Sequence, residues 1–234
     1  MISILCSSYN SDQWIGQYLE YLNKQYLHQF EVIFVDANST DGSLQKIKDY
    51  VFRGGIRKVI IESKERIGIY EAWNLAIENS TYNYVMNYNT DDKLFKSALM
   101  ILAANIKTNP EADVIYANNF ISNESTHTQL INFHNWTDAG HLPNLIAGCC
   151  CGPFPLLKKK SVVDAGMFDP RFTISGDYEM WCRMNVKGCK FMKIDEPLGV
   201  YYHNPTGMST DNNNRQEHIR QDSVIRDTYR SYIK

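Results

Sequence analysis

Short clusters of polar residues follow three apolar segments in the first half of the 234-residue chain. They occupy residues 7–10, 36–42 and 89–92, each directly after a run of mostly apolar residues. The clusters contain carboxylate, amide and hydroxyl groups, which can bind a nucleobase, a ribose or a divalent cation. Three such clusters at the same point after three similar segments predict one shared polar site.

Two adjacent carboxylates, Asp91 and Asp92, close the third cluster. An adjacent pair of this kind also occurs by chance in a solvated turn. Here, however, the pair directly follows an apolar segment, as the other two clusters do. Hard divalent cations take oxygen ligands and bridge phosphate oxygens, usually through one or two carboxylates. Such a cation would neutralise a departing nucleoside diphosphate. We therefore expect the pair to divide its work between a metal and ribose hydroxyls.

Asp36, the first residue after a predicted strand, is a candidate for hydrogen bonds to a nucleobase or ribose. The alternative is a turn residue that caps the next helix, because the Asn, Ser, Thr, Asp and Gly residues around it all favour turns. We expect ligand contact for Asp36 itself and the turn role for residues 38–42.

A third carboxylate, Asp177, follows Gly176 where a helix is expected to begin. Taken alone it would be a helix N-cap, a role worth about 1 kcal/mol. A transferase, however, needs one base to take the proton of its acceptor. Asp177 and its neighbour Glu179 are the candidates for that base.

Composition and missing motifs argue against several classes of function. The net charge of −2 disfavours nucleic-acid binding, which needs a basic excess. Neither a G-x-G-x-x-G sequence nor a Walker phosphate loop is present, which disfavours NAD enzymes and kinases. Three of the six cysteines are consecutive, at residues 149–151, and no C-x-x-C occurs, so we expect free thiols and no zinc site.

The elements that must position these clusters alternate between strands and helices. Strands are predicted at residues 2–6, 31–35, 59–61, 84–88 and 114–117, with helical spacing of apolar residues between them. This alternation predicts an α/β fold with a doubly wound, mostly parallel sheet. Such sheets bind ligands beyond the carboxyl ends of their strands, where the three polar clusters fall. The second half is less regular, with helices expected at residues 176–186 and 216–232.

The order and spacing of these motifs resemble the family 2 glycosyltransferases over roughly residues 2–205. The motifs that carry the resemblance are Ser7-Ser8-Tyr9-Asn10, Val35-Asp36-x-x-Ser39-Thr40-Asp41-Gly42, Gly68-Ile69-Tyr70-Glu71-Ala72-Trp73-Asn74, Asn89-x-Asp91-Asp92, Gly166-x-Phe168-Asp169 and Gly176-Asp177-Tyr178-Glu179-x-Trp181-x-Arg183. Each motif is modest alone, and their combination is specific.

The resemblance implies a GT-A fold in one domain, residues 1–234, with a nucleotide-sugar-binding half at 1–95 and an acceptor and catalytic-base half at 96–234. It implies transfer of a sugar from a nucleotide-sugar, UDP-linked by preference, to an acceptor hydroxyl with inversion. It also implies Mn²⁺ or Mg²⁺ and a role in polysaccharide biosynthesis. The implied site residues are Asp92 on the metal, Asp91 at the ribose or a metal-bound water, Asp177 as catalytic base, and Ser7, Tyr9 and Asp36 in the nucleoside pocket.

Three positions qualify these implied roles. Many family members carry a second acidic residue where this chain has Ala37, so recognition of the base would rest on Asp36. Arg66 stands near a position where relatives often have an acidic residue, and it can contact the diphosphate or face solvent. His203 falls where some members place a histidine near the metal; the alternative is an ordinary polar loop residue.

Two other functions share parts of this pattern. A sugar-nucleotidyltransferase also combines an α/β sheet with metal-binding carboxylates, but it normally has a Gly-rich basic loop after the first strand, which residues 7–10 lack. A non-catalytic nucleotide-sugar-binding protein of the same fold is the second, and the intact Asp91, Asp92 and Asp177 speak against it.

The sequence says less about the acceptor, the oligomeric state and the cellular location of the protein. The acceptor can be a saccharide, a lipid-linked sugar or a protein, and the sequence does not indicate an oligomeric state. No signal peptide or membrane-spanning run is visible, so we expect a cytoplasmic protein. Peripheral contact with the inner face of a membrane is compatible with that location.

Overall fold

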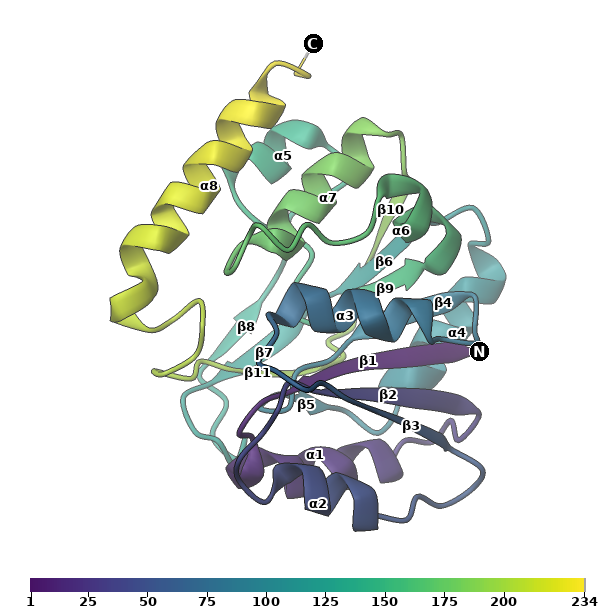
Figure 1. Ribbon diagram of the computed structural model, residues 1–234. Coiled ribbons are helices and arrows are strands. Elements are labelled where there is room, and N and C mark those ends of the chain that lie inside the picture. Colours follow the sequence, from purple (N-terminus) through teal and green to yellow (C-terminus); the bar gives the residue numbers. More distant parts are fainter. Residues whose placement is uncertain (234) are drawn as a thin grey trace.

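A seven-stranded sheet forms the centre of the molecule, and the computed structural model describes residues 1–233. In pairing order its strands are β10 (Phe191–Ile194), β6 (Val114–Ala117), β9 (Leu156–Lys158), β4 (Tyr84–Asn87), β1 (Ile2–Ser8), β2 (Phe30–Asp36) and β3 (Arg57–Glu62). Strand β9 pairs antiparallel with β4 and β6, and all other neighbours pair parallel. Figure 1 shows β1, β2 and β3 side by side with their carboxyl ends on the same side.

Helices cover both faces of this sheet, because its strands are apolar on both sides. In β1, Ile2, Ile4 and Cys6 face one core and Leu5 faces the other, as the two-residue period of a strand requires. One core is closed by α1 (Asp12–Asn23), α2 (Ser43–Asp49) and α4 (Ala98–Thr108). The other is closed by α3 (Ile69–Glu78), α5 (Leu142–Ala147), α6 (Lys159–Ala165), α7 (Gly176–Val186) and α8 (Arg215–Arg230).

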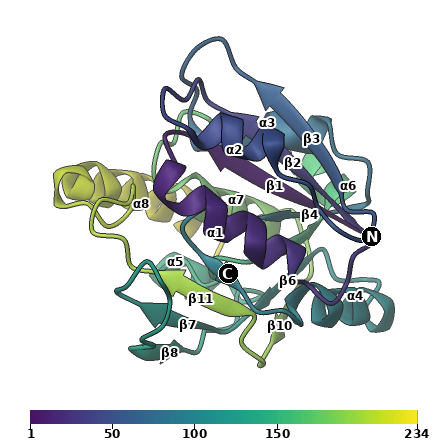
Figure 2. The ribbon, with the colours of Figure 1, turned by 90° about the horizontal axis from the view of Figure 1, so that it is seen from below.

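A second, four-stranded sheet stands apart from the large one. Its strands, in pairing order, are β5 (Lys93–Leu94), β11 (Gly199–Tyr202), β7 (Asn119–Ser122) and β8 (Asn132–His134). Figure 2 shows β7, β8 and β11 grouped together, away from β1, β2 and β3. Strand β5 directly follows Asp92, so the small sheet begins at the end of the third polar cluster. A short 3₁₀ turn, η1 (Asn212–Asn214), leads into α8.

The predicted α/β fold with a mostly parallel sheet is confirmed, with two corrections. The small sheet was not predicted. Asp36 is the last residue of β2 and not the first residue after it. The expected helix at residues 176–186 is confirmed as α7, and the cysteines are free thiols. Within residues 1–233, no helix is both long and apolar enough to cross a membrane.

Candidate active site

The carboxyl ends of β4, β1 and β2 bring the three polar clusters to one edge of the large sheet. Strand β1 pairs in parallel with β4 on one side and β2 on the other. The loops after β1 and β2 are joined directly. Asn10 Oδ1 accepts a hydrogen bond from the Thr40 amide at 2.8 Å, and the Asn10 amide donates to Ser39 Oγ at 3.1 Å. The predicted convergence is confirmed.

The two adjacent carboxylates lie at different depths. Asp92 is 1% exposed; its Oδ1 accepts from the Tyr202 amide at 2.9 Å, and its buried Oδ2 has no hydrogen-bond partner. Asp91 is partly buried, and its Oδ2 accepts from Asn204 Nδ2 at 3.1 Å. Burial and the neighbouring charge of Asp91 raise the pKa of Asp92 well above its usual range. Burial likewise raises the pKa of Asp91.

A divalent cation fits this arrangement. An ionised carboxylate oxygen that is buried without a partner is costly, and a cation beside Asp92 Oδ2 would remove that cost. Within residues 1–233 there is no group of three or more His, Cys, Asp or Glu side chains that could hold a metal. The protein would therefore supply only one or two carboxylates, which is the usual share for Mg²⁺ bound with phosphates and water.

His203 lies close to the two carboxylates in the fold, but its side chain is exposed. Its backbone amide donates to the Ser122 carbonyl at 2.8 Å. The residues on either side of it, Tyr202 and Asn204, are those that hydrogen-bond the aspartate pair. Metal ligation by His203 stays a prediction.

Asp36 takes the turn role that the sequence left open, and its contact with a ligand stays a prediction. Its Oδ2 accepts from the Ser39 amide at 2.9 Å, which fixes the turn after β2. Its Oδ1 is buried and has no partner. An acceptor of this kind is available to a hydrogen-bond donor on a nucleobase or ribose. Asp36 thus holds its own loop and still offers one oxygen to a ligand.

Tyr9 and Arg66 form a contact at the rim of the same edge. The Arg66 guanidinium carbon lies 4.4 Å from the centre of the Tyr9 ring, a cation–π distance. Both side chains are exposed, whereas Ser7, the next predicted nucleoside contact, is partly buried in β1. Contact of Arg66 with a diphosphate stays a prediction, as do the roles of Tyr9 and Ser7.

Asp177 lies in the first turn of α7, where the sequence placed it. Its Oδ1 accepts from the Tyr178 amide at 2.8 Å and lies 3.3 Å from the Tyr70 hydroxyl. Tyr70 also donates to the Ile174 carbonyl at 2.5 Å. Burial raises the pKa of Asp177, while the Tyr178 amide and the Tyr70 hydroxyl act in the opposite direction. A raised pKa makes a carboxylate a better general base.

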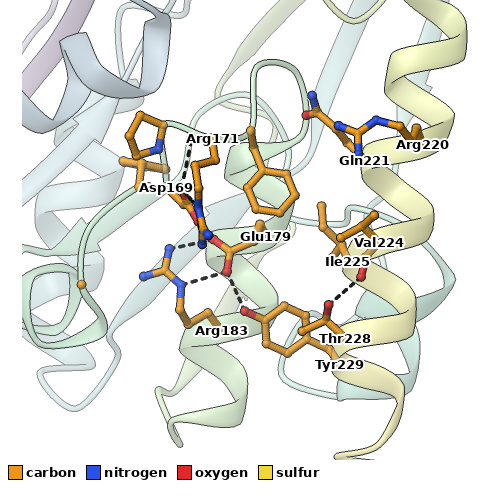
Figure 3. Close-up of a pocket in the computed structure, with 14 residues that line it drawn as sticks. Asp169, Arg171, Glu179, Arg183, Arg220, Gln221, Val224, Ile225, Thr228 and Tyr229 are labelled. Atoms are coloured by element: carbon orange, nitrogen blue, oxygen red, sulfur yellow. Dashed lines mark hydrogen bonds and ion pairs between the residues drawn. The ribbon is translucent and has the colours of Figure 1, made fainter.

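Glu179, the second candidate base, is fully engaged elsewhere. Its Oε1 accepts from Arg183 Nε at 2.9 Å and from the Tyr229 hydroxyl at 2.6 Å, and its Oε2 accepts from Arg183 Nη2 at 2.7 Å. Figure 3 shows these bonds at a cavity of about 750 Å³, which Glu179 lines and Asp177 does not. Glu179 therefore joins α7 to α8 and is not free to take a proton.

The pKa of Tyr201, a residue of β11, responds to all three carboxylates. Burial is the main cause that raises the pKa of Tyr201 to about 12, and the charges of Asp92, Asp91 and Asp177 act in the same direction. Tyr201 therefore lies within electrostatic reach of both the aspartate pair and the candidate base.

Several residues at this site were not predicted from the sequence. Tyr202 and Asn204 hold the aspartate pair, and His127 Nε2 lies 2.8 Å from the Asp91 carbonyl oxygen. His127 is 4% exposed and has a left-handed backbone, with φ of 54°. It comes from an irregular segment between β7 and β8 that carries no periodic signal. The Tyr201–Asn204 stretch was noticed only for its histidine, because a backbone amide donor leaves no mark in a sequence.

The whole chain was compared with known protein families, and residues 3–165 match the family model described as glycosyl transferase family 2. The matched range includes Asp36, Asp91 and Asp92 and ends before Asp177. The chain belongs to glycosyl transferase family 2.

Two curated relatives show how far the similarity extends. Poly-beta-1,6-N-acetyl-D-glucosamine synthase of Staphylococcus aureus (strain COL) is 24% identical over 205 residues, which cover 85% of this chain and 48% of the synthase. The amylovoran biosynthesis glycosyltransferase AmsB of Erwinia amylovora is 25% identical over 213 residues, covering 86% of this chain and 69% of AmsB. The chain thus spans about half the length of the synthases that it matches.

Solved structures support the GT-A fold. S. aureus TarS 1–349 in complex with UDP-GlcNAc superposes with a TM-score of 0.74 at 18% identity, over 96% of this chain and 66% of TarS. The mannosyltransferase PcManGT of Pyrobaculum calidifontis, in complex with GDP-Man and Mn²⁺, gives a TM-score of 0.73 at 16% identity, over 95% of this chain and 63% of PcManGT. At these identities the likeness concerns the fold.

Proposed function

We propose that this chain transfers a sugar from a nucleotide-sugar, specifically a UDP-sugar, to an acceptor hydroxyl with inversion at the anomeric carbon. The observation that carries the proposal is the convergence of the polar clusters at the carboxyl edge of the large sheet, where Asp36 Oδ1 and Asp92 Oδ2 are buried without a partner. A carboxylate pair at the sheet edge and one separate carboxylate nearby are what a metal-assisted single displacement needs. Membership of glycosyl transferase family 2 supports the reaction class.

The donor would lie along the carboxyl edge of β4, β1 and β2. Asp36, Ser7 and Tyr9 would hold the nucleoside, with the free Oδ1 of Asp36 as the main acceptor. Asp92 would hold Mn²⁺ or Mg²⁺ and Asp91 the ribose; when bound, the cation supplies positive charge against the diphosphate. The UDP-GlcNAc bound by TarS and the Mn²⁺ bound by PcManGT support this choice of donor and metal.

Asp177 would act as the general base. As the acceptor oxygen bonds to the anomeric carbon, the bond from that carbon to the diphosphate oxygen breaks. The diphosphate leaves with the bonding electrons, and Asp177 takes the hydroxyl proton. A single displacement inverts the anomeric configuration and forms no covalent glycosyl-enzyme, by the logic known from inverting glycosidases. The names of the relatives support a saccharide acceptor in polysaccharide biosynthesis.

The variant Asp177→Asn tests this function. It keeps the size of the side chain and an oxygen for the Tyr178 amide, so the fold should survive. We expect UDP release from UDP-sugars in the presence of saccharide acceptors to fall at least about a hundredfold, the lower range for loss of a general base. Affinity for the donor should stay within about twofold, because the donor contacts are elsewhere. UDP release by a coupled assay and calorimetry measure the two quantities.

Asp195→Asn is the matched control, since the Asp195 side chain is 90% exposed. Near-normal turnover of Asp177→Asn would overturn the base assignment. Release of pyrophosphate from UTP and a sugar 1-phosphate, without release of UDP from UDP-sugars, would identify a nucleotidyltransferase. Donor binding without turnover on any acceptor would favour a non-catalytic binding protein.

A further inference from the structure

Three successive backbone amides in front of Asp177 are bound by one side chain of the helix α8. Gln221 is 1% exposed, and its Oε1 accepts hydrogen bonds from the amides of Thr173, Ile174 and Ser175 at 3.2, 3.0 and 3.0 Å. Successive backbone N–H groups that converge in this way form a concavity suited to an anion or a carbonyl oxygen. Here the side-chain oxygen of Gln221 fills it.

Gln221 is itself held in one orientation. Its Nε2 donates to Thr173 Oγ1 at 2.8 Å and to Glu217 Oε1 at 2.7 Å. Glu217 in turn accepts from Arg220 at 2.6 and 2.7 Å. Because the amide nitrogen has two acceptors, the oxygen must face the loop. The orientation of this buried amide is therefore determined by its own hydrogen bonds.

The other side of the loop is held by α3. Tyr70 donates to the Ile174 carbonyl at 2.5 Å, and its ring packs against Gly176, where an added Cβ would lie only 2.7 Å away. Asp222 adds a bond at 2.7 Å to the Ser175 hydroxyl. The backbone directly before Asp177 is thus held from both sides, by Tyr70 on α3 and by Gln221 and Asp222 on α8.

The cavity between α7 and α8 lies next to this loop, and Gln221 is one of the residues that line it. Its arginines are paired within the chain: Arg183 with Glu179, Arg171 with Asp169, and Arg220 with Glu217. Figure 3 shows the first of these pairs, both of whose residues belong to α7, beside Tyr229 and Gln221 of α8. Each pair lies within one helix or loop, and the bond that joins α8 to α7 here runs from the Tyr229 hydroxyl to Glu179 Oε1 at 2.6 Å.

We propose that Gln221 is a positioning residue, which fixes the backbone of residues 173–175 and thereby aims the Asp177 carboxylate at the acceptor. This inference rests on the proposed role of Asp177 as the base. Misplacing a reacting group by about 1 Å can cost about a hundredfold in rate. Because Gln221 contacts the base loop and none of the donor-side carboxylates, its removal should slow turnover and spare donor affinity.

Gln221→Met is the first test, because methionine has a similar length and offers the loop no oxygen. We expect kcat to fall about ten- to a hundredfold, while the Kd for the UDP-sugar with Mn²⁺ changes less than about twofold. The amides of residues 173–175 should exchange hydrogen faster. Gln216→Met, an exposed glutamine of the same helix, is the matched control and should leave kcat unchanged.

Two further variants separate positioning from a general loss of structure. Glu217→Gln/Gln221→Glu exchanges the two side chains, returns an oxygen to the loop and should recover most of the lost turnover. In an Asp177→Asn background, Gln221→Met should cause little further loss of kcat, because residues that act through one group are not additive. If Gln221→Met does not fold, Gln221→Asn, which withdraws the oxygen from the loop, takes its place in both comparisons.

The results distinguish this inference from the proposed function. Normal kcat in Gln221→Met despite faster exchange of the loop amides would overturn the positioning role and leave Asp177 as the base. Equal losses with and without Asp177 would also overturn it, since they indicate a structural effect alone. Near-normal turnover of Asp177→Asn would remove the base assignment itself, and the role of Gln221 with it.

Discussion

Two buried carboxylate oxygens at the sheet edge, Asp36 Oδ1 and Asp92 Oδ2, have no hydrogen-bond partner. An unsatisfied buried polar group costs about 1–3 kcal/mol, and more when it is charged. Such a cost is expected where a ligand supplies the missing partner. At the residue scale, these two oxygens mark the nucleoside end and the metal end of the proposed donor site.

The aspartate pair can be separated by substitution. Asp92→Asn removes the charge proposed to hold the metal, so we expect the Kd for UDP with Mn²⁺ to weaken at least about a hundredfold, about 2.7 kcal/mol. Asp91→Asn should weaken it less, because an amide still offers hydrogen bonds to ribose and the carboxylate of Asp92 is retained. Calorimetry on both variants measures the difference.

The melting temperature without ligand is the control for the Asp92→Asn and Asp91→Asn variants. Asn at position 92 still offers an oxygen to the Tyr202 amide, and it removes a carboxylate whose burial raises its pKa. The melting temperature of Asp92→Asn without ligand should therefore not fall below that of the wild type. If Asp91→Asn loses more affinity than Asp92→Asn, the two roles are assigned to the wrong residues.

At the scale of elements, strand β11 ties the second half of the chain to the donor carboxylates. It pairs with β5, directly after Asp92, and with β7, and it ends at the Tyr202 amide that holds Asp92. Gly199 allows the first of these pairings. A Cβ at this position would overlap the Lys93 carbonyl oxygen and lie 2.8 Å from the Phe154 ring.

Gly199→Ala should therefore disturb both stability and binding. Overpacking at a tight site costs about 1–3 kcal/mol, which lowers the melting temperature by several degrees in a chain of this size. Affinity for UDP with Mn²⁺ should fall as well, because β11 shifts relative to Asp92. Thermal melts and calorimetry measure the two effects. Gly16→Ala in α1 is the control, since nothing lies within 4 Å of its added Cβ; wild-type behaviour of Gly199→Ala would contradict this role for β11.

The elements also explain what the sequence could and could not predict. Strands β1, β2 and β4 are buried on both faces and read as apolar runs, so the sheet and the cluster at its edge were predictable. The small sheet consists of strands of two to four residues that are too short for a periodic signal. The position of Asp177 in the first turn of a helix was predictable, but the bond from Tyr229 that engages Glu179 depends on the packing of α8 against α7.

At the scale of the whole molecule, the proposed division at residue 95 separates roles only in part. Residues 1–95 supply Asp36, Asp91 and Asp92, and the later half supplies Asp177. However, β6, β9 and β10 from the later half lie in the same large sheet as β1 to β4. Tyr202 and Asn204 also reach back to the aspartate pair. The proposed donor site and the proposed base therefore depend on one shared framework.

The central claim is that a divalent cation and a nucleoside diphosphate bind together at the carboxyl edge of the large sheet. Titration calorimetry of UDP into the protein, once with Mn²⁺ and once with EDTA, tests it most directly. We expect the Kd with Mn²⁺ to be tighter by at least about a hundredfold, or about 2.7 kcal/mol, and this gain to vanish in Asp92→Asn. Equal affinity for UDP in Mn²⁺ and in EDTA would contradict the claim.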